Sequence, residues 1–183
     1  MTSKRVIGGK KANANGKLLE GYVANANEVY HCTGRAYIAR IHTGTRITKD
    51  GKGIYANKVM ADYWGVLPGG RAVIIECKYR DNILWTPGGK PKDIDLKAML
   101  TQVKRKKGKK IVDTHQVEAC KAVQALGGMA VVIVGTRNPA GCFCLFAMYY
   151  RDEVVSHAAA MLCDVRRSGL VYDWLVNFEG EKP

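Results

Sequence analysis

The sequence lacks the patterns that mark several common classes of protein. It contains no uninterrupted apolar run long enough to span a membrane, and its N-terminus has no apolar core of a signal peptide. None of its six cysteines forms a Cys-x-x-Cys pair and no His-x-x-x-His motif is present, so we interpret Cys142 and Cys144 as small buried residues rather than zinc ligands. We therefore expect a cytoplasmic protein without membrane contact and without a disulfide framework.

Acidic residues are also scarce. The chain has 16 Asp and Glu against 29 Lys and Arg, which gives a net charge of +13 and a pI near 9.6. An excess of this size favours a polyanionic partner, and nucleic acid is the one we expect. At 183 residues with 47% hydrophobic residues, the chain is long enough for one domain with a substantial core.

A strong turn signal, Pro68-Gly69-Gly70, precedes a β-branched and aromatic stretch over 73–79 that is typical of a strand. We expect an antiparallel hairpin in which facing residues have numbers that sum to about 138, the value set by centring the turn on Gly69. This register places Asp62 opposite Glu76, with Cβ atoms roughly 4.5–5.5 Å apart. Lys78 shares their face because strand side chains alternate with a period of two.

Two carboxylates at that distance repel each other unless one is protonated or a cation lies between them. With a lysine beside them in a strongly basic chain, they favour metal-assisted cleavage of a phosphodiester. The alternative is an ordinary cross-strand salt bridge at a sheet edge. That alternative gives no reason for the second carboxylate at Asp62.

The remaining pattern divides the chain into a basic flexible arm over residues 1–16 and a single domain over 17–183. Asp113-Thr114 is the expected N-cap of the second helix, with Gln116 three residues after Asp113 as in a capping box. The elements alternate in an order that predicts an α/β fold with a mixed sheet flanked by helices. These elements are a helix from Lys17, a strand over 36–41, the hairpin, a helix from Asp113 to Gly127, strands over 129–134 and 142–149, a helix over 152–167, and residues 170–178, which fit either helix or strand.

Cations gather in three segments outside the predicted sheet. The arm carries Lys10 and Lys11, a polar excursion over 42–58 carries Arg46, and an insertion at about 80–112 contains six cations in seven residues. We expect these segments to contact a phosphate backbone, with a merely solvated surface as the alternative. The six cations of the insertion are Lys104, Arg105, Lys106, Lys107, Lys109 and Lys110.

Several motifs stand in a characteristic order over about residues 16–150. They are Glu20 on an opening helix, Asn27, Tyr30 and Gly34 after it, Asp62-Tyr63-x-Gly65, Glu76-x-Lys78, and His115-Gln116 at a helix start. Through them the chain resembles the RecU-type Holliday-junction resolvases of the restriction-endonuclease-like nuclease superfamily. It departs from the superfamily in having Ala61 where a proline precedes the first aspartate, and its excursion before Asp62 is short. The resemblance implies a restriction-endonuclease-like mixed β-sheet flanked by helices.

The resemblance also implies roles for individual residues. Lys78 would orient or deprotonate the attacking water, or stabilise negative charge in the transition state. Gln116 would touch the phosphate or the water, unless it only caps its helix, and Glu20 is otherwise a solvated helix residue. The expected ligands of Mg²⁺ or Mn²⁺ are the carboxylates of Asp62, Glu76 and Glu20 and the backbone carbonyl of Cys77.

The function we expect is therefore metal-dependent resolution of four-way DNA junctions by paired cuts. One chain holds one such constellation and two incisions are needed, so a homodimer is expected. The apolar stretches 129–134 and 170–178 offer hydrophobic surface for it, with a well-filled monomer core as the alternative. The competing functions are another nuclease of the same superfamily, acting on flap, nicked or duplex DNA, and a non-catalytic nucleic-acid-binding protein.

Overall fold

The computed structural model describes residues 4–42, 45–47, 50, 53–55, 59–80, 92–106, 109–155, 161–162, 164–165 and 172–178. Its elements in chain order are α1 (Lys4–Cys32), β1 (Tyr37–Arg40), β2 (Thr45–Ile47), β3 (Gly53–Tyr55), β4 (Tyr63–Val66), β5 (Ala72–Tyr79), β6 (Ile94–Asp95), α2 (Leu96–Leu100), β7 (Gln102–Lys106), β8 (Lys109–Asp113), α3 (His115–Ala125), β9 (Met129–Arg137), β10 (Phe143–Tyr149), β11 (Val154–Val155), β12 (Met161–Leu162), β13 (Asp164–Val165), β14 (Tyr172–Asp173) and the 3₁₀-helix η2 (Leu175–Phe178).

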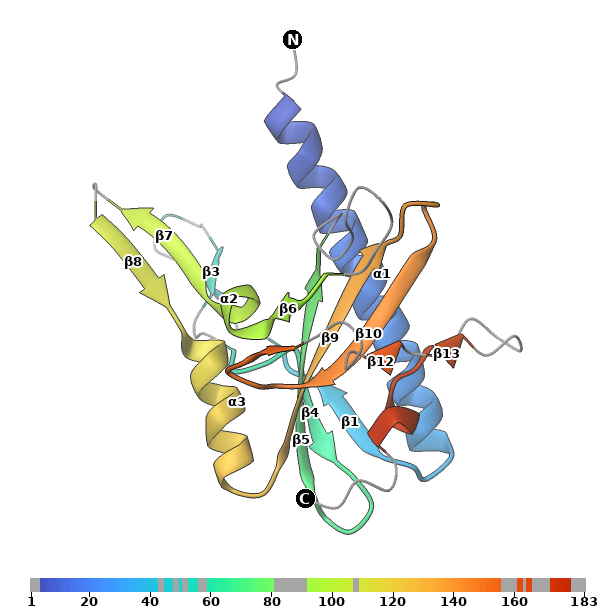
Figure 1. The fold of residues 1–183 in the computed structure, drawn as a ribbon. Helices are drawn as coiled ribbons and strands as arrows, with labels where there is room; N and C mark the ends of the chain where they lie inside the picture. The colour runs from blue at the N-terminus through green and yellow to red at the C-terminus, as the bar shows by residue number, and fades with distance from the viewer. Residues whose placement is uncertain are drawn as a thin grey trace.

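The described strands form one main sheet in the order β1-β4-β5-β9-β10-β12. The pairs β1–β4, β4–β5, β9–β10 and β10–β12 are antiparallel, whereas β5 and β9 are parallel and are joined by a crossover that contains α3. Figure 1 shows α1 on one side of this sheet and α3 on the other. The predicted α/β fold, a mixed sheet flanked by helices, is confirmed.

Both faces of the central strands are buried. On one face α1 packs by Leu19, Val23 and Tyr30 against alternate residues of β5 and β9, and on the other face α2 and α3 cover the intervening residues. Residues 129–136 are therefore buried without a break, as is typical of a strand covered on both sides. This places the stretch 129–134, which we expected to offer surface for a second copy, inside the core.

The N-terminal arm differs from the prediction, because α1 begins at Lys4 and runs through residues 4–16 without interruption. Those residues have no apolar periodicity, but Ala and Lys favour helix, and extending a helix that is already anchored by packing needs no new nucleation. The N-terminal half of α1 extends beyond the sheet in Figure 1. Lys10 and Lys11 thus lie on a helix, and the flexibility of the arm stays a prediction.

The predicted helix over 152–167 is wrong. Within the described residues this segment instead supplies β11, which pairs with β6, then β12 at the edge of the main sheet, and β13, which pairs with β14. The apolar residues had helical spacing, but pairing with partners distant in sequence decided the outcome. Residues 172–178, for which the sequence allowed either state, form a short strand and a 3₁₀ turn.

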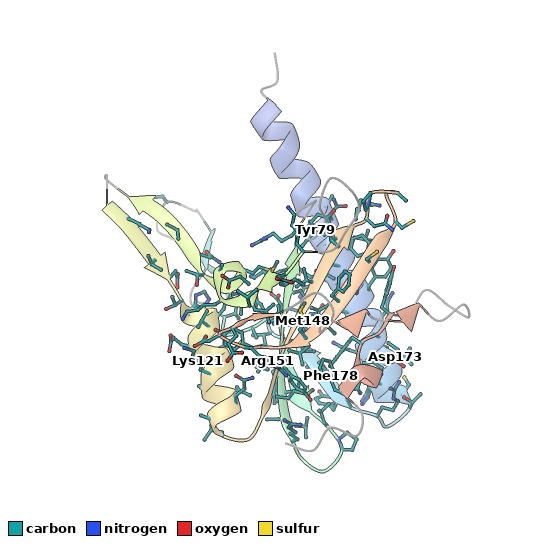
Figure 2. All side chains as sticks on the ribbon, viewed as in Figure 1. Tyr79, Lys121, Met148, Arg151, Asp173 and Phe178 are labelled. Carbon is teal, nitrogen blue, oxygen red and sulfur yellow. The ribbon has the colours of Figure 1, made fainter. Side chains whose placement is uncertain are left out.

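The C-terminal segment is held to α1 by a buried polar network. The Tyr30 hydroxyl donates to Asp173 Oδ1 at 2.8 Å, and Arg35 Nη1 donates to Asp173 Oδ2 at 2.9 Å. Trp174 Nε1 donates to Asn27 Oδ1 at 3.1 Å. Figure 2 shows Asp173 and Phe178 on the α1 side of the sheet, away from Lys121 on α3. The stretch 170–178 therefore completes the core of the domain over its described residues 172–178 and is not a free apolar surface there.

Two basic hairpins stand apart from the main sheet. β2 and β3 form one within the excursion that carries Arg46, and β7 and β8 form the other. The second hairpin, here called the β7–β8 ribbon (residues 102–113), extends away from the body of the domain in Figure 1. Its paired strands carry Lys104, Arg105, Lys106, Lys109 and Lys110, whereas Lys107 lies outside the described residues.

Candidate active site

The register of the β4–β5 hairpin brings the two predicted carboxylates together. Tyr63 pairs with Ile75 and Gly65 with Val73, so the facing residues sum to 138 as predicted. The ladder ends at the Tyr63–Ile75 pair, and the Asp62 N–H then donates to the Ile75 carbonyl at 3.0 Å. Asp62 lies close enough to Glu76 for its charge to raise the pKa of the Glu76 carboxyl.

Burial identifies the face on which these side chains lie. Tyr63 and Ile75 belong to the core under α1, so the alternate residues Asp62 and Glu76 point to the opposite face, the one that α3 covers. Ile74, two residues before Glu76, packs in the core under α3. The site is therefore at the C-terminal end of β5, between the sheet and the start of α3.

Glu76 is 3% exposed and is surrounded by donors. Lys78 Nζ lies 2.6 Å from Glu76 Oε1, and Gln116 Nε2 also donates to that oxygen. Lys78 Nζ donates in addition to Gln116 Oε1 at 3.0 Å, which closes a triangle of contacts. Burial, and next the charge of Asp62, raise the pKa of Glu76 to about 7, although Lys78 and Gln116 oppose the rise.

Asp62 is held from the other side. The backbone N–H of Cys77 donates to Asp62 Oδ2 at 2.7 Å. Burial raises the pKa of Asp62 above its ordinary range, whereas this hydrogen bond and the charges of Lys78 and Arg40 lower it. Burial and the nearby carboxylates also raise the pKa of the Cys77 thiol well above its ordinary value, so the thiol is no candidate nucleophile.

Gln116 does not cap its helix. Thr114 occupies the expected N-cap position of α3, and Asp113 Oδ1 accepts the backbone N–H of His115 at 3.3 Å. Asp113 Oδ1 also lies 2.8 Å from His115 Nδ1. The Gln116 side chain contacts Glu76 and Lys78 rather than the end of its helix, so the predicted capping box is not formed. These contacts fit the role expected for it beside the phosphate or the water.

Glu20 is placed differently from the other candidates. Its carboxylate pairs with Arg40 on β1, and its backbone carbonyl accepts from the Tyr63 hydroxyl at 2.9 Å. The charge of Glu20 contributes to the raised pKa of Cys77, so Glu20 lies near enough to the site to affect it electrostatically. These two bonds direct Glu20 to Arg40 and Tyr63 rather than to Asp62 or Glu76. The sequence pattern did not single out Arg40. The signal that could have found it is its position at the end of strand 37–40, opposite Tyr63 and next to Asp62.

The residues present fit a divalent cation. Glu76 Oε2 is buried and has no hydrogen-bond partner among the described residues, which is an unfavourable state for a carboxylate oxygen that no cation contacts. In a strand the N–H and C=O of one residue point to the same side, so the Cys77 carbonyl, like its N–H, faces Asp62. Two carboxylates and a carbonyl are oxygen ligands of the kind that Mg²⁺ takes together with water. No cluster of three or more His, Cys, Asp or Glu side chains suited to a metal occurs within the described ranges.

Comparison with known proteins adds no relative to this description. No family model and no curated protein matches the sequence. Among the helices of the part of the chain that the structure describes, none is both long and apolar enough to cross a membrane.

Proposed function

We propose that this protein is a metal-dependent endodeoxyribonuclease that cuts four-way DNA junctions. The observation that carries the proposal is the pair of a half-buried Asp62 and a buried Glu76 on one sheet face, with an unsatisfied Glu76 oxygen and with Lys78 in contact. A purely structural salt bridge needs Glu76 and Lys78 but not Asp62, whose burial costs free energy because its pKa is raised. Such a cost is typical of functional sites.

Each residue has a role that follows from its contacts. Asp62, Glu76 and the Cys77 carbonyl would hold Mg²⁺ or Mn²⁺, and such a cation, when bound, lowers the pKa of a ligated water and offsets charge on a phosphate. Lys78 carries a positive charge that stabilises an anionic phosphate or orients the water. Gln116 fixes the Lys78 ammonium and the Glu76 carboxylate relative to each other.

The charge distribution supports DNA as the substrate. The β7–β8 ribbon leads directly into α3, and its last residue, Asp113, lies three positions before Gln116. DNA held by the cations of the ribbon would thus lie next to the carboxylate face. Val103 and Val112, which pair across the ribbon, are each more than half exposed, so at this pair the ribbon is not packed on its own domain.

Paired incision would require two copies of the site, and we propose a homodimer on this ground. The two apolar stretches that the sequence suggested for its interface are buried within one chain where they are described, so the dimer rests on the chemistry of the substrate. Light scattering in moderate salt, with and without a junction, tests it. A mass of 20.1 kDa per protein particle in both states would remove the dimer.

The substrate is tested by one gel. Four-way junction, flap, nicked duplex and linear duplex are compared at matched concentration in Mg²⁺. We expect the junction to be cut first and symmetrically. Equal cutting of all substrates would favour a general nuclease of the same type, and binding without any cutting would favour the non-catalytic alternative.

A further inference from the structure

Trp64 presents an aromatic surface on the same sheet face as the two carboxylates. Side chains of β4 alternate, with Tyr63 and Gly65 buried toward α1 and with Trp64 and Val66 pointing the other way. The indole is 50% exposed. Among the described elements, α3 packs mainly against β5 and β9 rather than against β4 and β1.

The position of Trp64 along the strand is as informative as its exposure. It follows Asp62 by two residues on one face, so the strand rise separates their Cα atoms by about 7 Å. A phosphate held at Asp62 and Glu76 would carry its neighbouring base toward the indole. Trp64 belongs to neither core cluster of the described residues, and it is held in the sheet by its backbone pairing with Ala39 and Ile74.

A second exposed aromatic lies at the edge of the sheet. Tyr37 pairs with Val66, which places its backbone diagonal to Trp64, and it is 55% exposed. Its ring packs edge to face on the ring of His31, with centroids 5.3 Å apart. This contact holds the Tyr37 ring against the C-terminal end of α1, so Trp64 is the exposed aromatic residue beside the carboxylates.

The net charge of the chain decides between possible occupants. Arg35 and Arg40 on the neighbouring strand segment are already paired with Asp173 and Glu20. The chain as a whole carries a net charge of +13, so a second copy would be repelled and a polyanion attracted. Single-stranded nucleic acid is the polyanion that an exposed aromatic ring binds, because every base offers a face for stacking.

We propose that Trp64 is a stacking platform for unpaired bases of the nucleic acid. The inference rests on the proposed function and deepens it, since the site places the strand beside the platform. It gives the protein a preference for DNA whose bases are unstacked next to the phosphate in the site. A base inside a continuous duplex has both faces covered and cannot use the platform.

The test separates unpaired from paired DNA without requiring cleavage. Affinities for an oligothymidylate and for a duplex of equal length are measured in chelator at one salt concentration, in an Asp62→Asn background. Trp64→Ala should weaken binding of the oligothymidylate by about ten-fold or more and leave duplex binding unchanged, whereas Trp64→Phe should retain most of the affinity. Leu126→Ala, at an exposed apolar residue at the far end of α3, is the control and should change neither.

Any other effect of Trp64→Ala on binding or on mass overturns the platform. Equal weakening on both DNAs would make Trp64 a general contact, and no weakening would make it a bystander. A change in the mass of Trp64→Ala by light scattering, with DNA affinity intact, would assign the surface to another copy. If Trp64→Ala weakens oligothymidylate binding selectively but the wild-type protein never cleaves DNA, the platform stands and the nuclease proposal is removed. The failure of one proposal can therefore be told from the failure of the other.

Discussion

Replacing Glu76 by Gln should remove a large part of the pH dependence of stability of the metal-free protein. Folding raises the pKa of this carboxyl from 4.5 to about 7, so between these values the folded state holds a proton that the unfolded state has released. Stability from this group is therefore fully present below pH 4.5 and is lost as the pH rises through about 7. The size of the effect is about 3 kcal/mol at most.

The assay is urea unfolding in chelator at about pH 5 and about pH 8, on either side of the raised pKa. A loss of about 3 kcal/mol corresponds to a fall of roughly 1–2 M in the urea midpoint of the wild type. In Glu76→Gln this fall should shrink by about that amount, because the amide does not titrate. Glu118→Gln, at an exposed carboxyl on α3, serves as control and should keep the pH dependence of the wild type.

Parallel curves for the wild type and Glu76→Gln would refute the reasoning. They would mean that Glu76 is ionised in the folded state as readily as in the unfolded one. Mg²⁺ adds a second measurement, because a cation that binds only the folded, ionised site stabilises it at the higher pH. The stabilisation by Mg²⁺ should be absent in the variant.

Three further predictions concern other parts of the molecule. Lys78→Ala should destabilise the metal-free protein more at about pH 8 than at about pH 5, since Glu76 is left as an unpaired buried charge only when it is ionised; thermal melts at the two pH values check this. Gly65→Ala should cost several kcal/mol of stability or prevent folding, because the added Cβ would lie 2.1 Å from the Tyr37 carbonyl oxygen. Gly16→Ala is the control in the same melts: it has open space around it on α1 and should stabilise the protein by up to about 1 kcal/mol. Neutral replacement of the cations over 104–110 should weaken DNA binding and flatten the plot of log affinity against log salt by about 0.9 for each phosphate that is no longer neutralised; an unchanged slope would make the ribbon a solvated surface.

The central hairpin could be predicted from the sequence because local signals and burial agree there. Pro68-Gly69-Gly70 sets the turn, and the period of two then assigns every side chain of β5 to a face. One extra residue in the turn would have moved Asp62 away from Glu76. The pairing of the two carboxylates therefore follows from chain geometry that the sequence makes explicit.

Other parts of the fold depend on contacts that no local pattern reveals. Val154 has helical spacing with Ala158, Met161 and Val165 in the sequence, yet Val154 and Val155 pair with Asp95 and Ile94 of β6, far earlier in the chain. Gln116 satisfies the spacing of a capping box, but its amide bonds the buried carboxylate of Glu76 instead. In both cases a partner distant in sequence outweighs the local preference.

Glu20 shows the same effect within the candidate site. Its place on an opening helix suggested a metal ligand, but its carboxylate pairs with Arg40. The position of Arg40 on β1 depends in turn on the register with β4, which brings it opposite Tyr63. The direction of the Glu20 side chain therefore depends on the pairing of β1 with β4, which the residues around Glu20 in the sequence do not predict.

The measurement that tests the central claim most directly is cleavage of a four-way junction by the wild type, Asp62→Asn and Glu76→Gln, purified in parallel. The account predicts symmetric incision by the wild type in Mg²⁺, none in chelator, and a loss of at least about a hundred-fold in both variants while they still bind the junction. Undiminished cutting by Glu76→Gln, or cutting by the wild type in excess chelator, would contradict it.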